Sequence, residues 1–355
     1  MLDFIPDAWM LGLIGLFGGA ILGLAARLGR FCTLGAIEDY LYQGSDLRLR
    51  MWGLAIGVAG LGTYTLVAFG FLDPGQSIYH AAGWSPAIAI IGGLVFGYGM
   101  ALAGNCGFGA LARFGGGDLR SFVIVLVMGV SAYVMLSGPF ASLRLAALDA
   151  TDIATTAKTY PEALSAATGL PAVWLGALIC AAITALALWS SEMFRSPKAI
   201  ACGSCVGLAI VSGWAGTQWV SETGFSVTPV NSHTFTSPLG ETLLFLMTSS
   251  GGGMSFGVGS VFGVLAGAFS GSLIKGHFRW EACEDPRELK RQFLGAILMG
   301  FGAIMAMGCT IGQGISAFSL LTLNAPLVFG AIFAGAAIGL KQLITGFSFG
   351  SSSAI

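Results

Sequence analysis

The stretch from Ser121 to Leu143 carries no charged side chain, and apolar runs of this kind recur along the whole chain. Charged residues make up 9% of the sequence, against about 25% in soluble domains. So few charges cannot cover a surface in water, whereas a bilayer accepts outward-facing apolar side chains. Because the runs approach the ~20 residues of a spanning helix, we expect an all-α integral membrane protein, folded as one polytopic domain over residues 1–355.

Nine segments are apolar enough to be candidate spans. They are Trp9–Ala26, Met51–Leu72, Pro86–Gly104, Ser121–Leu143, Ala172–Ser191, Ala199–Trp219, Met254–Leu273, Phe293–Gly308 and Pro326–Leu340. Phe293–Gly308 is short and runs into a glycine-rich turn, which predicts a helix broken inside the membrane. The sequence thus predicts about nine transmembrane helices plus broken or re-entrant helices. Residues 144–170 are expected to form an external loop.

The basic residues fall on one side of this predicted topology. With the N-terminus outside, the cytoplasmic side receives Arg27, Arg30, Arg48, Arg50, Arg113, Arg120, Arg195, Lys198, Lys275, Arg279, Arg287, Lys290, Arg291 and Lys341. Only Arg144 and Lys158 fall outside. The bias predicts an external N-terminus and a cytoplasmic C-terminus, although a re-entrant segment among the later spans would invert the second half.

One short motif, Cys-x-x-Gly, occurs three times at the end of an apolar segment, as CTLG at Cys32, CGFG at Cys106 and CTIG at Cys309. The preceding segments align with it without a gap. Gly92, Gly97 and Gly99 coincide with Gly295, Gly300 and Gly302, and Gly18, Gly19 and Gly23 coincide with Gly92, Gly93 and Gly97. Matches between glycines arise easily by chance in a chain with 55 glycines. Chance does not explain three cysteines at the same position of the repeat.

Internal repeats on broken helices are typical of transport sites near the membrane midplane. In the predicted topology the Cys106 turn is approached from outside and the Cys309 turn from inside. We therefore expect pseudo-symmetric inverted halves, residues 1–170 and 171–355. Glycines let backbone N–H groups approach a ligand, the start of a helix favours an anion, and a thiol adds a weak donor and a polarisable sulfur. These properties suit a sulfur-containing anion.

The motifs FCTLGAIEDYL, AGNCGFGALARFGGGDLRS and MGCTIGQGISAFS resemble the YeeE/YedE family of bacterial inner-membrane proteins, which is associated with uptake of thiosulfate and related sulfur compounds. VGLAIVSGWAGT and HTFTSPLGETLLFLM extend the resemblance to nearly the whole chain. It implies an hourglass-like helical protein whose neck is lined by Cys32, Cys106 and Cys309. The anion would pass between thiols by S–H hydrogen bonds, without covalent capture. Some members work beside a small cytoplasmic sulfur-carrier protein.

Other cysteines and arginines of the sequence allow more than one interpretation. Cys202 and Cys205 form a C-x-x-C, which indicates helix packing, an accessory thiol pair or a metal site. Arg113 and Arg120 are either cytoplasmic anchors or a means of concentrating an anion at the inner exit. Cys283 is expected to be a loop thiol. Without a nucleotide-binding motif or a strongly basic balance, we expect no cofactor, metal or nucleic-acid partner.

These observations predict a permease that imports thiosulfate, or a closely related sulfur anion, across the bacterial inner membrane. The residues expected to bind the substrate are Cys32, Cys106, Cys309, Gly107, Gly109, Thr310, Gly312 and Gln313. Two alternatives stay open at this point. One is a membrane sulfurtransferase carrying a cysteine persulfide, which needs a low-pKa thiol beside a cation or base. The other is a passive anion channel.

Overall fold

The fold is known from a computed structural model, which describes residues 6–81, 83–224, 228–249, 253–282 and 285–346. In these ranges the chain is helical and forms no β-strand, so the all-α prediction is confirmed. The long helices are α1 (Asp7–Gly29), α3 (Leu47–Ala68), α5 (Pro86–Ala103), α7 (Leu119–Leu136), α10 (Ala172–Leu188), α12 (Pro197–Thr223), α14 (Phe256–Ile274), α15 (Pro286–Met305) and α16 (Asn324–Thr345). Several begin with proline in the first turn, where its missing N–H costs nothing.

Shorter helices follow or connect the long ones. They are α2 (Thr33–Glu38), α4 (Ile78–Ala81), α6 (Gly107–Phe114), α8 (Ala141–Thr151), α9 (Tyr160–Thr168), α11 (Ser191–Phe194) and α13 (Ser237–Thr248), with 3-10 turn η2 (Pro74–Gln76) and π-helical η1 (Asp39–Gln43) and η4 (Gly312–Ala317). The predicted span Ser121–Leu143 was too long, because α7 ends at Leu136. The segment expected to be a loop contains α8 and α9 instead.

Seven helical segments of the described chain are long and apolar enough to cross a membrane. Helix α10 is apolar but shorter. Helix α15 opens on a charged turn with Arg287, Glu288, Lys290 and Arg291, so it does not meet the same criterion. The predicted count of nine is therefore not confirmed, although the multi-pass character is.

Glycine faces bring the helices into close contact. On α1, Gly15, Gly19 and Gly23 recur every four residues, and each Cα faces backbone of α14. On α14, Gly259, Gly263 and Gly267 lie against the α1 residues Gly12, Leu16 and Ala20. Because the residue numbers rise together on both helices, α1 and α14 are parallel. Helix α5 crosses α15 in the opposite sense, with Gly92 on Gly302 and Gly99 on Gly295. A side chain at these positions would collide with backbone, so the aligned glycines of the repeat are packing residues.

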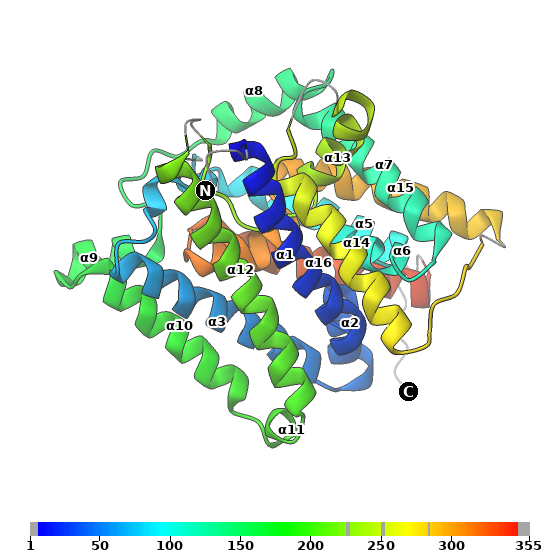
Figure 1. Cartoon of the computed structure of the whole chain (residues 1–355), viewed down its shortest axis with the longest axis horizontal. Helices are drawn as coiled ribbons and strands as arrows, with labels where there is room; N and C mark the ends of the chain where they lie inside the picture. The colour runs from blue at the N-terminus through cyan, green and yellow to red at the C-terminus, as the bar shows by residue number, and fades with distance from the viewer. Residues whose placement is uncertain (1–5, 82, 225–227, 250–252, 283–284, 347–355) are drawn as a thin grey trace.

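The helix pairs show an exchange pattern. Helices α1, α12 and α14 run side by side in Figure 1, and α3 packs on α12 as α14 packs on α1. Likewise α7 packs on α15 as α16 packs on α5. If α1 is exchanged with α12, α3 with α14, α5 with α15 and α7 with α16, the same helix pairs remain in contact. Helix α10 has no exchange partner in this set.

Basic residues gather at one end of the helix bundle. Arg27 donates to Ser272, Lys275 donates to the Arg27 carbonyl and Arg50 donates to Leu186, so the ends of α1, α10 and α14 and the start of α3 meet. We call this the basic end. The opposite end carries α4, α8 and α9, and we call it the α9 end. In Figure 1, α8 lies at the top of the view and α11 at the bottom.

Candidate functional site

The three cysteine turns share two backbone features. Two residues before each cysteine the chain enters the left-handed region, with φ 55° at Arg30, 76° at Gly104 and 57° at Met307. Each cysteine carbonyl then accepts an N–H from the fourth residue on, which restarts a helix. A left-handed residue costs about 1–2 kcal/mol unless it is glycine, so Arg30 and Met307 are held there by their surroundings. The in-frame repeat thus has a physical counterpart: a helix that stops and restarts at the cysteine.

The fixed glycine in Cys-x-x-Gly contributes its backbone N–H. Gly109 N–H donates to Cys106 Sγ over 3.3 Å, and Gly312 N–H points at Cys309 Sγ over 3.5 Å. At the first turn the Cys32 side chain receives no such hydrogen bond. The thiols of Cys106 and Cys309 are therefore fixed in direction at a helix start, where further N–H groups are free for an anion.

The fold brings the turns together. The Cys106 thiol lies within electrostatic range of Cys32 and Cys309, and beside the Thr310 hydroxyl. Cys106 and Cys309 are each 1% exposed, whereas Cys32 is half-buried. The three cysteines predicted from the repeat thus converge in the interior, with Cys32 the one that solvent reaches.

A cavity of about 300 Å³ opens beside Cys32 at the basic end. Its wall includes Asn105 and Gly109 of the Cys106 turn. Four guanidinium groups line it, from Arg27, Arg30, Arg48 and Arg113, and one carboxylate, from Glu38. We call this cavity the basic vestibule.

The positive charge of the vestibule is only partly neutralised. Arg48 pairs with Asp39 over 3.1 Å, and Arg27 donates to the uncharged Ser272. Lys275 directly follows α14, outside its membrane-spanning part. Partial burial and repulsion from Arg30, Arg27 and Lys198 lower the pKa of its ammonium group. This cluster raises the local concentration of anions.

Two residues that the sequence did not single out, Thr234 and Tyr79, lie beside the Cys309 turn. Thr234 Oγ1 is 3.8 Å from Cys309 Sγ. A Cβ at Gly312 would lie 3.1 Å from Thr234 Cβ and 3.2 Å from the Tyr79 hydroxyl. Gly312 is therefore a glycine because these side chains crowd its Cα. The polar stretch around HTFTSP was the only local signal for Thr234, and nothing local marks Tyr79.

Several buried polar atoms at these turns have no hydrogen-bond partner. They include Thr33 Oγ1, Thr310 Oγ1 and Gln313 Oε1, although Gln313 Nε2 donates to the Met307 carbonyl over 3.1 Å. Thr310 is 0% exposed and Gln313 2%. Buried polar groups are nearly always paired, so these atoms beside the thiols are available to an incoming ligand.

The glycines predicted for the site divide by role. A Cβ at Gly107 would lie 2.7 Å from Met128 Sδ, so Gly107 lets α6 pack on α7. At Gly109 the nearest atoms would be Asn105 Oδ1 at 3.5 Å and Cys106 Sγ at 3.6 Å, which is ordinary contact. A methyl group at Gly109 would thus fit beside the thiol without a clash, in the wall of the vestibule.

The remaining cysteines lie elsewhere. The Cys202 thiol donates to the Ala25 carbonyl over 3.5 Å and contacts Gly29, which favours the packing interpretation of the C-x-x-C. Cys205 is exposed, and Cys283 lies outside the described residues. In the part of the chain that the structure describes, no three His, Cys, Asp or Glu side chains gather as metal ligands would.

Arg113 and Arg120, the two arginines considered for the inner exit, have different surroundings in the structure. Arg113 lines the basic vestibule. Arg120 is engaged with Asp118, Glu281 and Glu288 at 3.3, 3.7 and 3.6 Å. Its charge is neutralised by these carboxylates, so Arg120 anchors the start of α7 to the following loops rather than serving the vestibule.

A comparison with known families matches residues 28–338 to the model described as sulphur transport. The chain belongs to this family. The match confirms the resemblance to YeeE/YedE proteins stated from the motifs, and it includes all three cysteine turns.

Two curated relatives of this sulphur transport protein are both named thiosulfate transporter TsuA. The one from Escherichia coli (strain K12) is 28% identical over 327 residues, covering 87% of this chain and 88% of the relative. The one from Spirochaeta thermophila is 25% identical over 319 residues, covering 87% and 92%. The similarity thus extends over nearly the full length of each protein.

Proposed function

We propose that this protein is a permease that imports thiosulfate, or a closely related small sulfur-containing anion, into the cytoplasm. The observation that carries the proposal is the basic vestibule that reaches Cys32, with Cys106 and Cys309 converging behind it. The names of the curated relatives support thiosulfate as the substrate. An anion in the vestibule is met by guanidinium groups, and in the interior by thiols, hydroxyls and backbone N–H groups.

The relay runs between Cys309, Cys106 and Cys32. Each thiol is a weak donor with a polarisable surface, so it contacts the terminal sulfur of the anion without binding it tightly. The N–H groups of Gly109 and Gly312 hold the Cys106 and Cys309 thiols in place, and Gly107 sets the position of α6. Thr310 and Gln313 contribute buried polar atoms at the neck. Because the neighbours that hold the Cys106 and Cys309 thiols are uncharged, the anion is not trapped there.

Orientation follows from the charge separation. The basic end faces the cytoplasm of a bacterial inner membrane, which puts the N-terminus outside and the C-terminus inside. Residues 1–170 and 171–355 are the two inverted halves, in keeping with the exchange pattern of the packing partners. A small cytoplasmic sulfur-carrier protein would receive the anion at the vestibule mouth.

The protein acts as a transporter rather than as an enzyme. A sulfurtransferase thiol needs a cation or base beside it to form a thiolate. The charged groups of the site lie in the vestibule around Cys32, whereas the fully buried Cys106 and Cys309 have hydroxyl and thiol neighbours. A persistent covalent sulfur adduct that turns over with substrate would favour the enzyme.

The test is sulfur-limited growth of cells that lack other thiosulfate importers, with single cysteine-to-alanine variants. Cys106→Ala and Cys309→Ala are expected to abolish growth on thiosulfate, because each removes one step of the relay. Cys180→Ala is the matched control, since Cys180 is 0% exposed but lies against Gly60 of α3, away from the turns. Growth of both site variants at the parental rate would refute the site.

A passive channel is separated from a permease by kinetics. Initial uptake of [35S]thiosulfate into proteoliposomes should saturate with concentration, because the anion occupies a specific set of donors. A rate that rises linearly with concentration, with no competition from unlabelled thiosulfate, would indicate a channel.

A further inference from the structure

The Cys309 turn is covered on its α9-end side by two hydroxyl side chains. Tyr79 comes from α4 and is 8% exposed, and its ring packs edge-on against Trp214 at 6.2 Å. Thr234 comes from the segment between α12 and α13. Both hydroxyls crowd the Cα of Gly312, whose N–H points at the Cys309 thiol. These residues are buried around Cys309, whereas Cys32 opens to the basic vestibule.

Thr234 lies in the segment that matches the one carrying Cys32 in the exchange pattern of the helices. Cys32 follows α1, and Thr234 lies in the segment that follows α12, the exchange partner of α1. Cys32 lies near Cys106, and Thr234 lies 3.8 Å from Cys309. The second half thus places a hydroxyl where the first half places a thiol.

The segment that carries Thr234 is irregular but firmly held. Ser232 donates to the Ile210 carbonyl, Thr217 donates to the Asn231 carbonyl, and Ser316 donates to the His233 carbonyl, each over 2.7 Å. His233 Nδ1 meets Ser260 Oγ over 2.8 Å. Non-helical backbone at membrane depth is tolerated where it is buried in protein or lines a path. These bonds fix the backbone and leave the Thr234 hydroxyl directed at Cys309.

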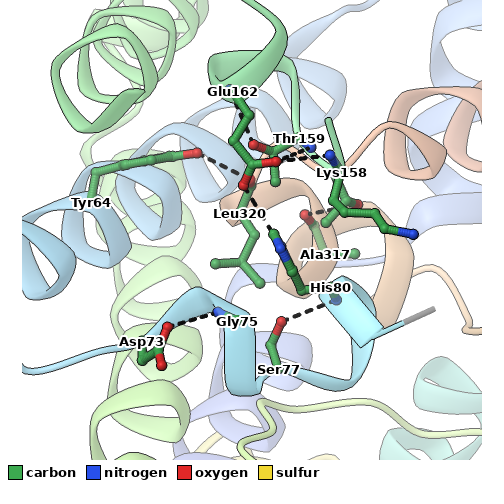
Figure 2. Close-up of polar contacts among 11 residues, drawn as sticks. Tyr64, Asp73, Gly75, Ser77, His80, Lys158, Thr159, Glu162, Ala317 and Leu320 are labelled. Atoms are coloured by element: carbon green, nitrogen blue, oxygen red, sulfur yellow. Dashed lines mark hydrogen bonds and ion pairs between the residues drawn. The ribbon is translucent and has the colours of Figure 1, made fainter. Parts of the chain in front are cut away.

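Helix α4 joins the site to the α9 end. Ser77 pairs with Val230, and His80 lies 3.8 Å from Glu162, which also accepts the Lys158 and Thr159 N–H groups (Figure 2). The same figure shows Tyr64 donating to Leu320, near the end of the segment that contains Cys309. The His80 contact thus ties α4 to the start of α9, while Tyr79 is buried at the Cys309 turn.

We propose that Thr234 and Tyr79 bind the oxygen atoms of the sulfur oxyanion while Cys309 contacts its sulfur, and that Tyr79 closes the path toward the α9 end. The inference rests on the proposed function and adds to it a source of selectivity. Hydroxyl donors suit the hard oxygens, whereas the thiol suits the soft terminal sulfur. The pair would favour oxyanions of sulfur over sulfide or a simple thiolate, which offer no oxygen acceptors.

The first test is the concentration dependence of [35S]thiosulfate uptake into proteoliposomes for Thr234→Val and Tyr79→Phe. Each removes one hydroxyl at nearly constant volume, and each is expected to raise KM tenfold or more, as for a lost hydrogen bond to a charged group. Thr234→Ser keeps the donor and should stay within about threefold of the parent. Thr63→Val is the matched control, because buried Thr63 only donates to Ala59 in its own helix.

The outcomes separate the two proposals. If Cys309→Ala abolishes uptake while Thr234→Val and Tyr79→Phe keep the parental KM, the hydroxyl pair is wrong and the permease stands. If Cys106→Ala and Cys309→Ala both transport like the parent, the cysteine site of the proposed function itself fails. Should Thr234→Val not fold, the Thr234→Ser and Tyr79→Phe results decide on the same criteria.

The second test is the reaction of Cys309 with a membrane-impermeant maleimide added from the α9 end and located by peptide mass spectrometry. Tyr79→Ala should raise the modification rate of Cys309 tenfold or more, whereas Tyr79→Phe, which keeps the ring, should not. Equal rates in the parent and in Tyr79→Ala would show that Tyr79 does not close the path.

Discussion

Adding one methyl group at Gly109 separates folding from transport. In Gly109→Ala the new Cβ would lie 3.5 Å from Asn105 Oδ1, 3.6 Å from Cys106 Sγ and 3.7 Å from Asn105 Cβ, all ordinary contacts. Gly109 lies within α6, and replacing a helical glycine by alanine favours the helix by about 0.5–1 kcal/mol. The variant should therefore unfold at the parental temperature or a few degrees higher.

Transport should nevertheless fall. The methyl group projects into the vestibule wall beside the Cys106 thiol, where the anion has to approach the thiol and the neighbouring N–H groups. Displacing the anion from one donor forfeits about 1.5–3 kcal/mol, which corresponds to roughly a ten- to hundredfold loss in kcat/KM. Initial rates of [35S]thiosulfate uptake into proteoliposomes measure this loss, and thermal unfolding in detergent measures stability.

Gly330→Ala is the matched control. Gly330 is an exposed helical glycine of α16 with no heavy atom within 4 Å of an added Cβ. It should gain the same helix stability and keep the parental transport. Parental kcat/KM in Gly109→Ala would refute the placement of Gly109 on the anion path. A loss of transport that is matched by a loss of thermal stability would refute the packing argument instead.

Three further changes test other parts of the structure. Neutralising the vestibule with Arg30→Gln or Arg113→Gln should raise KM severalfold at low ionic strength and less at high, because salt screens attraction of the anion; equal effects at both would argue against steering. Gly263→Leu should abolish the yield of detergent-stable protein, because the side chain would meet the Leu16 carbonyl of α1; normal yield would contradict the close packing. Met307→Gly should raise the unfolding free energy by up to about 1 kcal/mol, since glycine adopts the left-handed conformation without strain; lower thermal stability would show that the Met307 side chain matters more.

Local features of the site were readable from the sequence. The cysteine and the glycine three positions on recur in frame, so the sequence located each turn. The left-handed conformation of Arg30 and Met307 was not predicted, because their surroundings impose it. The length and apolarity of the helices likewise depend on consecutive residues, which is why the membrane character and the positions of the turns could be predicted.

Other predictions failed at helix ends and at charges. The end of α7 and the helices α8 and α9 were missed, although Gly138 and Pro139 follow α7 and a capping box between Thr159 and Glu162 starts α9. Apolar residues continue past Pro139 as far as Leu143, which hid the boundary. Arg120 and Arg113 looked equivalent in sequence. Only the fold directs one into the vestibule and pairs the other with Glu281 and Glu288, far along the chain.

The sequence by itself determined a multi-pass helical protein with three Cys-x-x-Gly turns and a strong bias of basic residues. The tertiary structure alone decided that Cys32 opens to a basic vestibule while Cys309 is covered by Tyr79 and Thr234. The physical reason is distance along the chain: a helix stop needs only adjacent residues, whereas the neighbours of a thiol are chosen by glycine faces that bring together helices hundreds of residues apart.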